Sequence, residues 1–354
     1  MQILAMPDPS QTLKQKGPTM KSLLALLLLT SAACADTLPG FDRLAVDAPH
    51  RARPLEAAVW YPAASETYVA AVGANAAFVG TSVQMGAAVA TGAHPLVIIV
   101  HGSGGNIENL GWLAEGLVAR GAIVAGVNHP GATSGDSSPR QLPRIIDRTQ
   151  DMAALITALM DDPAYGPSID PAQIAALGFS LGGATVLAAA GAQFDPSAIA
   201  AYCDTYGSDA SECVFMARGG VDPHNLPPEI SADMTLPGLA RIIAVDPALG
   251  HTLVPASLTD LPPVHLIRMG GPAVVPPARD IGPDGSNLAA VIPGSSFATI
   301  APAWHFSFLG LCTPDAPAML AAEGEDPICD EPAGADRATV HDQVLEAVIG
   351  HLGL

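Results

Sequence analysis

The clearest chemical signature in the sequence surrounds Ser180. This serine is the central residue of GFSLG at residues 178–182, which matches the pattern G-x-S-x-G. The pentapeptide follows a short apolar run, residues 174–177, and precedes a segment with helical periodicity, residues 181–192. Between a strand and a helix, such a pattern forms a sharp turn that exposes the serine hydroxyl. The sequence therefore predicts that Ser180 is a nucleophile; an unreactive serine in a glycine-rich turn is the alternative.

A nucleophilic serine needs a histidine base, which a carboxylate orients. In a chain of alternating strands and helices, the acid and then the histidine follow the serine. Six histidines follow Ser180: His224, His251, His265, His305, His341 and His351. His305 is best placed, because it lies after the last expected strand and before the terminal helix. His251, five residues past a strand, remains an alternative, whereas the others lie in a strand, on the last helix or in an irregular segment.

A second glycine-rich motif, HGSGG at residues 101–105, follows another apolar run. Glycines at this place let the backbone curl so that amide groups point toward the site, as half of an oxyanion hole requires. The other half is the amide of the residue after the nucleophile. This predicts an oxyanion hole formed by the amides of Ser103 and Leu181. His101 is expected to pack beneath the loop and not to act as the base.

Short apolar runs bounded by Gly, Pro, Asp or Asn predict strands that are buried on both faces. They cover residues 96–100, 123–127, 174–177, 242–245, 264–269 and 297–300. Segments with helical periodicity lie between several of these runs and at the end of the chain, at residues 109–120, 145–160, 181–192 and 340–352. The alternation predicts a mostly parallel central sheet with helices on both faces. Residues directly after the strands then gather at one sheet edge, where ligands bind.

Three regions depart from this alternation. Residues 55–62 alternate weakly in polarity and suit an early antiparallel strand, whereas residues 63–94 are rich in Ala and Gly and permit no assignment. Residues 195–237 contain two cysteines, a Gly pair and several prolines, with little periodicity. So long an interval predicts an irregular lid or cap over the carboxyl edge of the sheet. Because no linker or repeat is evident, residues 36–354 are expected to form one domain.

The charge balance excludes several classes of protein. The chain of 354 residues has a formal net charge of −19, and its three lysines, Lys14, Lys16 and Lys21, all precede the expected domain. Without a cluster of basic residues, the domain is not expected to bind nucleic acid or an anionic membrane surface. Chemistry that needs a catalytic or phosphate-binding lysine is excluded as well. Neither HExxH nor CxxC occurs, and no metal or cofactor is expected.

The N-terminus resembles a leader peptide. From Met20 the chain has Lys21, the apolar residues 23–29 and then SAACA at residues 31–35, which are an n-region, an h-region and a cleavage site of A-x-A type. Cleavage is expected after Ala35, giving an exported protein in the periplasm or outside the cell. The apolar stretch is too short for a stable membrane span. Lipidation at Cys34 is an alternative that the flanking residues fit less well.

Four cysteines remain after removal of the leader, an even number in an oxidising compartment. Their spacing favours two local loops, Cys203 with Cys213 and Cys312 with Cys329. Both pairs lie in segments that contain Gly, Asp or Pro and are expected to be irregular. Unpaired buried thiols are the alternative.

Together these motifs resemble the α/β-hydrolase esterases of the dienelactone-hydrolase-like and platelet-activating-factor-acetylhydrolase-like group. The resemblance rests on VWYP at residues 59–62, HGSGG at 101–105, NHPG at 128–131, GFSLGG at 178–183 and HFSFL at 305–309, with Cys312 close behind. It implies an α/β-hydrolase fold and the hydrolysis of small-molecule or lipid-like carboxylic esters through an acyl-enzyme intermediate, without a cofactor. True dienelactone hydrolases have a cysteine where this chain has Ser180, so their substrate is not carried over.

The acid of the site has two candidate positions. Many relatives place it after the strand at residues 264–269, but here no carboxylate follows until Asp280, with Asp284 beyond it. The acetylhydrolase-like pattern places it at the end of the preceding strand, where Asp246 stands. A carboxylate at a strand end is rigidly aimed, whereas an acid in a Pro- and Gly-rich loop is most often solvated. The predicted triad is therefore Ser180, Asp246 and His305, with Asp280 as the alternative acid.

The same three residues are compatible with other activities. A peptidase or an acyltransferase can use the same triad, because the triad specifies neither the leaving group nor the acceptor. A non-catalytic binding protein with this fold is a further alternative. The covalent labelling of Ser180 and the turnover of esters would discriminate among these hypotheses.

Overall fold

A ten-stranded sheet lies at the centre of the structure, a computed structural model that describes residues 37–271 and 273–354. Its strands are β1 (Gly40–Val46), β2 (Leu55–Tyr61), β3 (Val69–Val72), β4 (Thr81–Met85), β5 (His94–Val100), β6 (Ile123–Asn128), β9 (Ile169–Phe179), β10 (Leu239–Val245), β11 (Val264–Met269) and β12 (Ser296–Ile300). The spatial order is β12-β11-β10-β9-β5-β6-β2-β1-β4-β3. A short ribbon of β7 (Ala132–Thr133) and β8 (Asp136–Ser137) is separate. The expected leader and Cys34 lie outside the described residues.

The strands from β12 to β6 run parallel to one another, and β2 pairs antiparallel with both β6 and β1. This confirms the mostly parallel sheet and the early antiparallel strand. The parallel strands are apolar and buried because helices cover both faces of the sheet. All six residues of β11, for example, are buried.

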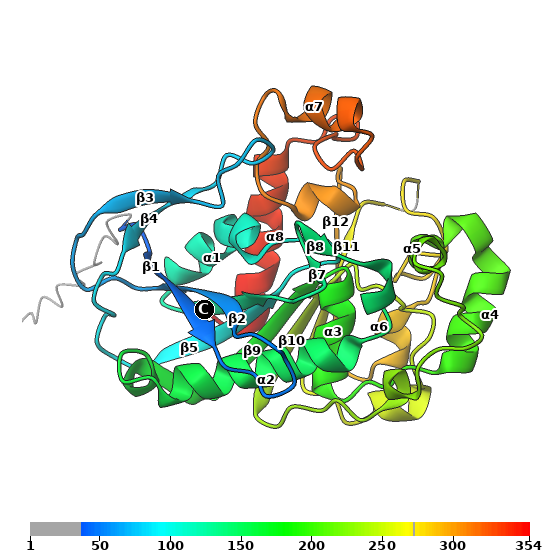
Figure 1. The fold of residues 1–354 in the computed structure, drawn as a ribbon, viewed down its shortest axis with the longest axis horizontal. Helices are drawn as coiled ribbons and strands as arrows, with labels where there is room; N and C mark the ends of the chain where they lie inside the picture. Colours follow the sequence, from blue (N-terminus) through cyan, green and yellow to red (C-terminus); the bar gives the residue numbers. More distant parts are fainter. Residues whose placement is uncertain (1–36, 272) are drawn as a thin grey trace, which may run out of the picture. The chain divides into compact units, whose positions relative to one another are not determined.

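Four helices cover the two faces of the sheet (Figure 1). These helices are α1 (Gly111–Val118), α2 (Ile145–Asp161), α3 (Leu181–Ala190) and α8 (Arg337–Leu352). One apolar core contains residues of α2 and α3, and a second contains residues of α1 and α8. Each core also takes alternate residues of the parallel strands, because successive side chains of a strand point to opposite faces. The predicted helical segments therefore occupy both faces of the sheet, as expected.

Residues 195–237 are more regular than the sequence indicated. They contain two helices, α4 (Pro196–Tyr206) and α5 (Ser211–Arg218), which lie beside the sheet (Figure 1). Asp195 caps α4 by accepting a hydrogen bond from the Ser197 amide, and Pro196 occupies the first turn, where its missing N–H costs nothing. The expectation of an irregular segment was wrong because each helix is short and buries only a few residues, which leaves no clear periodicity.

The two predicted disulfides are confirmed. Cys203 in α4 is bonded to Cys213 in α5, so this pair lies on helices and not in irregular chain. Cys312 is bonded to Cys329, and this bond closes a loop that contains α7 (Ala316–Glu323). The remaining helix, α6 (Leu288–Val291), precedes β12. No helix in the described ranges combines the length and apolar character that a bilayer span requires.

Candidate active site

Ser180 lies in a sharp turn between β9 and α3. Its backbone φ is 56° and ψ is −119°, a conformation that non-glycine residues rarely adopt. Two glycines make this turn possible. A Cβ atom at Gly178 would lie 2.0 Å from the Gly182 carbonyl oxygen, and one at Gly182 would lie 2.0 Å from the Val100 carbonyl oxygen. A larger residue at Gly178 or Gly182 would therefore clash with these carbonyl oxygens and displace the turn, and Ser180 with it, from the carboxyl edge of the sheet.

Three predicted side chains meet at this turn. The Nε2 atom of His305 lies 3.2 Å from the Ser180 Oγ atom, and its Nδ1 atom lies 3.0 Å from Oδ2 of Asp246. The other carboxylate oxygen of Asp246 accepts a hydrogen bond of 2.8 Å from the Met269 amide. When Nδ1–H donates to the carboxylate, Nε2 is left with a lone pair that can accept the serine proton. Asp246 and not Asp280 is thus the acid that contacts His305.

Asp280, the alternative acid, lies elsewhere and is not solvated as expected. Its carboxylate is 1% exposed and forms an ion pair with Arg268 on β11, with N–O distances of 2.9 and 3.0 Å. It also accepts a hydrogen bond from the Gly282 amide. The expectation was wrong because Arg268 is buried in β11 and needs an anionic partner. Asp284 is exposed.

The other five histidines after Ser180 have partners outside this cluster. His224 contacts Asp204, and His265 contacts Ser296. His251, His341 and His351 lie within hydrogen-bond distance of the carbonyl oxygens of Pro277, Leu309 and Pro263, respectively. The position of His305 between the last strand and the terminal helix was the signal that distinguished it.

The two predicted oxyanion residues, Ser103 and Leu181, both line the same pocket as Ser180 and His305. Leu181 is the first residue of α3, and amides in the first turn of a helix have no acceptor within the helix. The loop of Ser103 passes close to the nucleophile, since a Cβ atom at Gly102 would lie 3.2 Å from the Cβ of Ser180. The next two amides of this loop, at residues 104 and 105, donate to other carbonyls.

His101 is 1% exposed beneath this loop, as expected. Its Nε2 accepts a hydrogen bond of 3.2 Å from the His129 amide, and its Nδ1 lies 2.7 Å from the Gly102 carbonyl oxygen. Burial holds the pKa of His101 well below its usual value. Arg148 of α2 donates to the His101 carbonyl oxygen and, over 3.0 Å, to Thr185 of α3. This arginine therefore links the loop of Ser103 to the helix that follows Ser180.

A buried carboxylate, Asp151, lies one helical turn beyond Arg148. It accepts hydrogen bonds of 2.7 and 2.8 Å from Arg51, and it lies 2.8 Å from His129 and 2.7 Å from His50. Burial alone would raise the pKa of Asp151, but the hydrogen bonds from His129 and Arg51 outweigh it and hold this pKa below its usual value. Asp151 and Arg148 were not predicted from the sequence; the available signal was two charged residues on the apolar face of α2.

We expect the free energy of unfolding to decrease as the pH falls from about 6.5 to 4. Burial lowers the pKa values of His129 and His341 to about 4, whereas unfolded histidines titrate near pH 6.5. Between these values each histidine is protonated in the unfolded state only, which destabilises the folded state by about 1.4 kcal/mol per pH unit. Urea denaturation at pH 7, 5.5 and 4.5 measures the trend.

His341→Phe provides the matched variant for this experiment. The ring of His341 stacks on Trp112 with centroids 3.7 Å apart, and phenylalanine keeps an aromatic ring without the titrating group. The variant should therefore show a weaker dependence of unfolding free energy on pH than the wild type. If the unfolding free energy depended equally on pH in both proteins, His341 would not contribute to this dependence.

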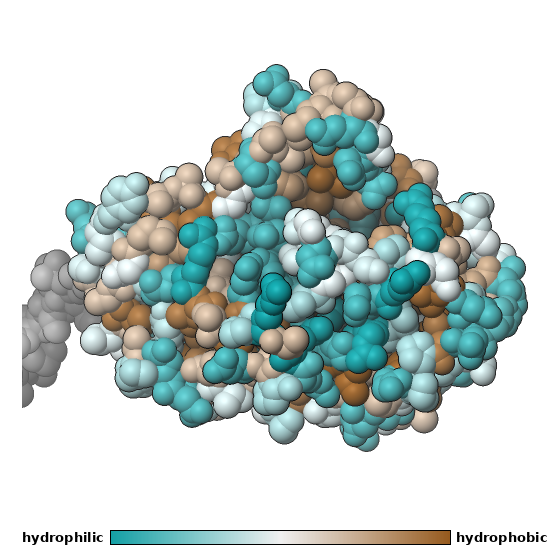
Figure 2. Space-filling view, viewed as in Figure 1, coloured by the Kyte–Doolittle hydropathy of each residue, from teal (hydrophilic) through white to brown (hydrophobic). Residues whose placement is uncertain are grey.

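A pocket of about 1040 Å³ opens above Ser180 and His305. Its walls come from the segment of α5, from the loop after β11, and from residues 304–309 and 320–328. Apolar side chains visible as brown in the recess below the top segment, which contains α7, agree with this lining (Figure 2). The apolar lining includes Phe179, Leu142, Phe215, Met269, Trp304, Phe306 and Leu309, and the charged lining includes Glu212, Arg218, Arg279, Glu323, Glu325 and Asp326.

In the described part of the chain, no group of three or more His, Cys, Asp or Glu side chains could hold a metal ion.

The parallel sheet with helices on both faces and a serine in the turn after β9 define the α/β-hydrolase fold, and the chain adopts this fold. Residues 91–202, less than half of the chain, match the family model described as serine aminopeptidase, S33. No curated protein sequence matches the chain significantly.

Among solved structures, the chain is similar to a ferulic acid esterase from Streptomyces cinnamoneus, with 18% identity, 92% of each chain covered and a TM-score of 0.56. It is also similar to a dienelactone hydrolase from Anabaena variabilis, with 14% identity over 89% of this chain and 99% of the other and a TM-score of 0.47. A puromycin-hydrolyzing peptidase from Mycobacterium tuberculosis matches with 19% identity over 89% of this chain and 39% of the other, with a TM-score of 0.49. At these identities, the similarity to the ferulic acid esterase establishes the fold.

Proposed function

We propose that the protein is an exported serine hydrolase that cleaves carboxylic esters. The observation that carries this proposal is the alignment of Ser180, His305 and Asp246, with separations of 3.2 and 3.0 Å, at the wall of a large pocket. The fold supports it, because α/β hydrolases carry a nucleophile in the turn that Ser180 occupies. The resemblance of the motifs to the dienelactone-hydrolase-like and acetylhydrolase-like esterases narrows the proposal to that group.

The proposed reaction has two stages. His305 Nε2 takes the proton of Ser180 as its Oγ attacks the ester carbonyl, and Asp246 stabilises the imidazolium that forms. The amides of Ser103 and Leu181 donate to the oxyanion. The alcohol leaves with the proton from His305, and an acyl group remains on Ser180. A water molecule, activated by His305, then releases the acid and restores the serine.

A panel of chromogenic esters with increasing acyl length tests this proposal directly. The pocket wall combines apolar side chains with charged groups, so we expect turnover of several esters and a preference among them. Ser180 should also react covalently with an organophosphate. If Ser180 reacts with neither ester nor organophosphate, the protein is a binding protein with this fold.

The second candidate activity is that of a peptidase, which the match of residues 91–202 to a serine aminopeptidase model favours. The same three side chains can cleave an amide if His305 protonates the leaving amine. Aminoacyl nitroanilides measured beside the matching aminoacyl esters distinguish the two. Faster cleavage of the nitroanilides than of simple esters would favour the peptidase.

Export is part of the proposal, because it supplies the oxidising compartment in which disulfides persist. When the full chain is produced in a host that exports it, we expect a mature N-terminus at Asp36 and two bonds, Cys203–Cys213 and Cys312–Cys329. Each bond should contribute roughly 2–4 kcal/mol to the stability of the folded state. Intact mass spectrometry with thiol alkylation before and after reduction measures both features. Four alkylated thiols before reduction, or a lipid mass on Cys34, would contradict this expectation.

A further inference from the structure

The residues on both sides of His305 are bonded to one short segment near the end of the chain. Before His305, the indole Nε1 of Trp304 donates a hydrogen bond of 2.8 Å to the Asp330 carbonyl oxygen. After it, the Ser307 hydroxyl donates to a carboxylate oxygen of Glu331. The same Ser307 Oγ accepts a hydrogen bond of 3.1 Å from the Trp304 amide. Residues 330–331 therefore fix the turn that carries His305 at two points.

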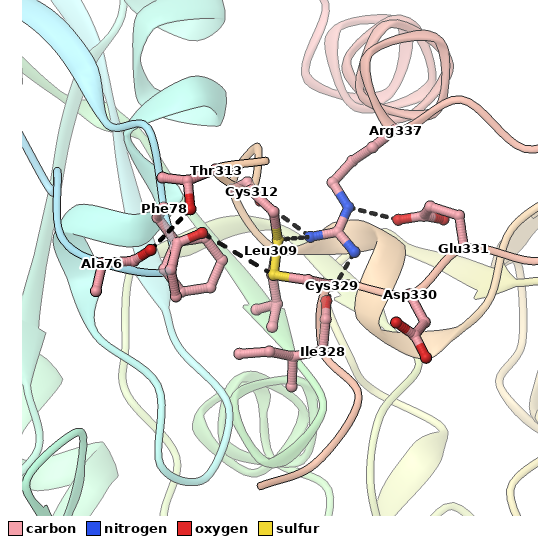
Figure 3. Close-up of a disulfide and its surroundings, with 12 residues drawn as sticks. Ala76, Phe78, Leu309, Cys312, Thr313, Ile328, Cys329, Asp330, Glu331 and Arg337 are labelled. Atoms are coloured by element: carbon pink, nitrogen blue, oxygen red, sulfur yellow. Dashed lines mark hydrogen bonds and ion pairs between the residues drawn. A yellow bond between two sulfur atoms is a disulfide. The ribbon is translucent and has the colours of Figure 1, made fainter. Parts of the chain in front are cut away.

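Arg337, the first residue of α8, holds Glu331 in this position (Figure 3). Its Nε donates to the carboxylate oxygen of Glu331 that Ser307 does not use. Its two Nη atoms donate to the carbonyl oxygens of Gly310 and Ile328, over 3.0 and 2.7 Å. The side chain of Arg337 is only 7% exposed. Because α8 belongs to one of the two apolar cores, the arginine ties this surface segment to the rigid body of the domain.

The disulfide between Cys312 and Cys329 completes the attachment. It places Cys329, which directly precedes the segment, beside residue 312, seven residues after His305. Nη1 of Arg337 lies 3.1 Å from the Cys312 sulfur (Figure 3). The neighbouring Thr313 hydroxyl donates 2.7 Å to the Ala76 carbonyl oxygen. Residues 330–331 are thus held by the His305 turn, by Arg337 and by the disulfide at Cys329.

The turn of His305 needs such support. It is a 3₁₀ helix of four residues, His305–Phe308, and helices this short are not stable by themselves. Asp246 contacts only the Nδ1 edge of the imidazole ring, and Phe179 packs beside the ring with centroids 4.6 Å apart, but neither contact fixes the backbone of the turn. The distance between Nε2 and the Ser180 hydroxyl then depends on the position of the turn.

We propose that Glu331 is a positioning residue for His305: it fixes the turn through Ser307 and so keeps Nε2 aligned with Ser180. This inference rests on the proposed serine-hydrolase function. Arg337 neutralises the carboxylate of Glu331, so the effect on His305 is geometric. A misplacement of about 1 Å in a reacting group can reduce a rate about 10²-fold.

The experiment compares Glu331→Gln with Asp330→Asn, two variants that each remove one negative charge from adjacent positions. In glutamine an NH₂ group replaces one carboxylate oxygen, so the side chain cannot accept from both the Arg337 Nε and the Ser307 hydroxyl at their present positions. With its oxygen facing Arg337, it can only donate toward Ser307 Oγ, which already accepts from the Trp304 amide. The side chain of Asp330 is exposed and contributes only its backbone carbonyl to the contacts above. We expect kcat for a chromogenic ester to fall roughly 10- to 100-fold in Glu331→Gln with little change in KM, and to stay unchanged in Asp330→Asn.

Two further measurements separate positioning from a loss of folded protein. First, labelling with an organophosphate until the reaction is complete measures how many molecules carry an active Ser180. The rate constant kcat is then divided by this number and not by the total protein. Ser307→Ala should reproduce the fall, and the double variant with Glu331→Gln should lose no more than the larger single effect, because both changes break one chain of hydrogen bonds. A wild-type kcat per labelled site in Glu331→Gln, or losses that multiply in the double variant, would overturn the inference.

A separate readout keeps the inference testable if the wild type turns over no substrate. Hydrogen–deuterium exchange at the C2 position of the His305 ring, followed by mass spectrometry, reports its environment without catalysis. We expect the exchange rate to change in Glu331→Gln and to match the wild type in Asp330→Asn. The same rate in all three proteins would overturn the positioning role, whereas absent turnover alone would count against the proposed function.

Discussion

Ser180→Ala should reduce kcat for ester hydrolysis by about 10⁶-fold, the scale of loss seen when such a nucleophile is removed. The substitution deletes only the Oγ atom that lies 3.2 Å from His305 Nε2. The Cβ atom and the tight glycine packing around the turn remain, so the melting temperature should stay close to that of the wild type. Covalent labelling by an organophosphate should disappear, as measured by intact mass spectrometry.

The matched control is Ser197→Ala on the exposed surface of α4. It removes the same atom at a position remote from the proposed chemistry, and it should keep wild-type turnover and labelling. Near-normal ester turnover in Ser180→Ala would refute the proposed mechanism. Residual labelling at another serine would place the nucleophile elsewhere.

Asp246→Asn should lower kcat by about 10⁴-fold. The asparagine keeps the shape of the side chain and can still accept from the Met269 amide. It cannot stabilise the imidazolium of His305, and its NH₂ group favours the wrong tautomer of the ring. Steady-state kinetics at a fixed pH, with folded protein counted by circular dichroism, measure the loss.

Asp280→Asn is the comparison variant, and its effect should fall on stability. The change removes the anionic partner of Arg268, whose side chain is only 7% exposed, and breaking a buried ion pair in this way costs about 3–5 kcal/mol. We therefore expect a lower melting temperature with kcat per folded molecule close to the wild-type value. If Asp280→Asn lost the activity and Asp246→Asn kept it, the acid of the triad would be Asp280, in the loop after β11.

The parts of the site that could be predicted from sequence are those encoded by local patterns. Ser180 is marked by glycines two residues away on each side, whose absence of side chains the turn requires. His305 is marked by its place between the last strand and the terminal helix. Asp246 needed the resemblance to known esterases as well, because a carboxylate at a strand end is not by itself distinctive. Ser180 and Asp246 directly follow strands that the apolar runs located correctly, and His305 lies shortly after the last of these strands.

The contacts that remained unpredicted join residues far apart in the chain. Arg148 contacts His101, and Glu331 contacts Ser307; neither pair has a spacing that indicates contact. Charged residues also concealed the first strand. No strand was predicted at β1, which contains the charged residues Asp42 and Arg43. Asp42 accepts hydrogen bonds from two tyrosine hydroxyls, and Arg43 pairs with Glu108. The charged side chains interrupt the apolar pattern of β1, so the sequence did not indicate a strand there.

The edge strand β3 and its neighbour β4 were missed for a different reason. β3 ends the sheet and buries only one of its four residues. Such a strand has little apolar periodicity to detect, because its stability comes from pairing with β4 and not from burial on both faces.

The position of Asp246 has a consequence for how substrate preference can change. Because the proposed acid comes from the end of β10, the loop after β11 contributes no residue to the proposed triad. That loop instead contributes Val274, Val275 and Arg279 to the pocket wall. The ion pair between Asp280 and Arg268 attaches the end of the loop to β11. Mutations at Val274, Val275 and Arg279 should therefore reshape the pocket wall without moving the proposed acid, which makes these positions a starting point for evolving new ester preferences in the laboratory.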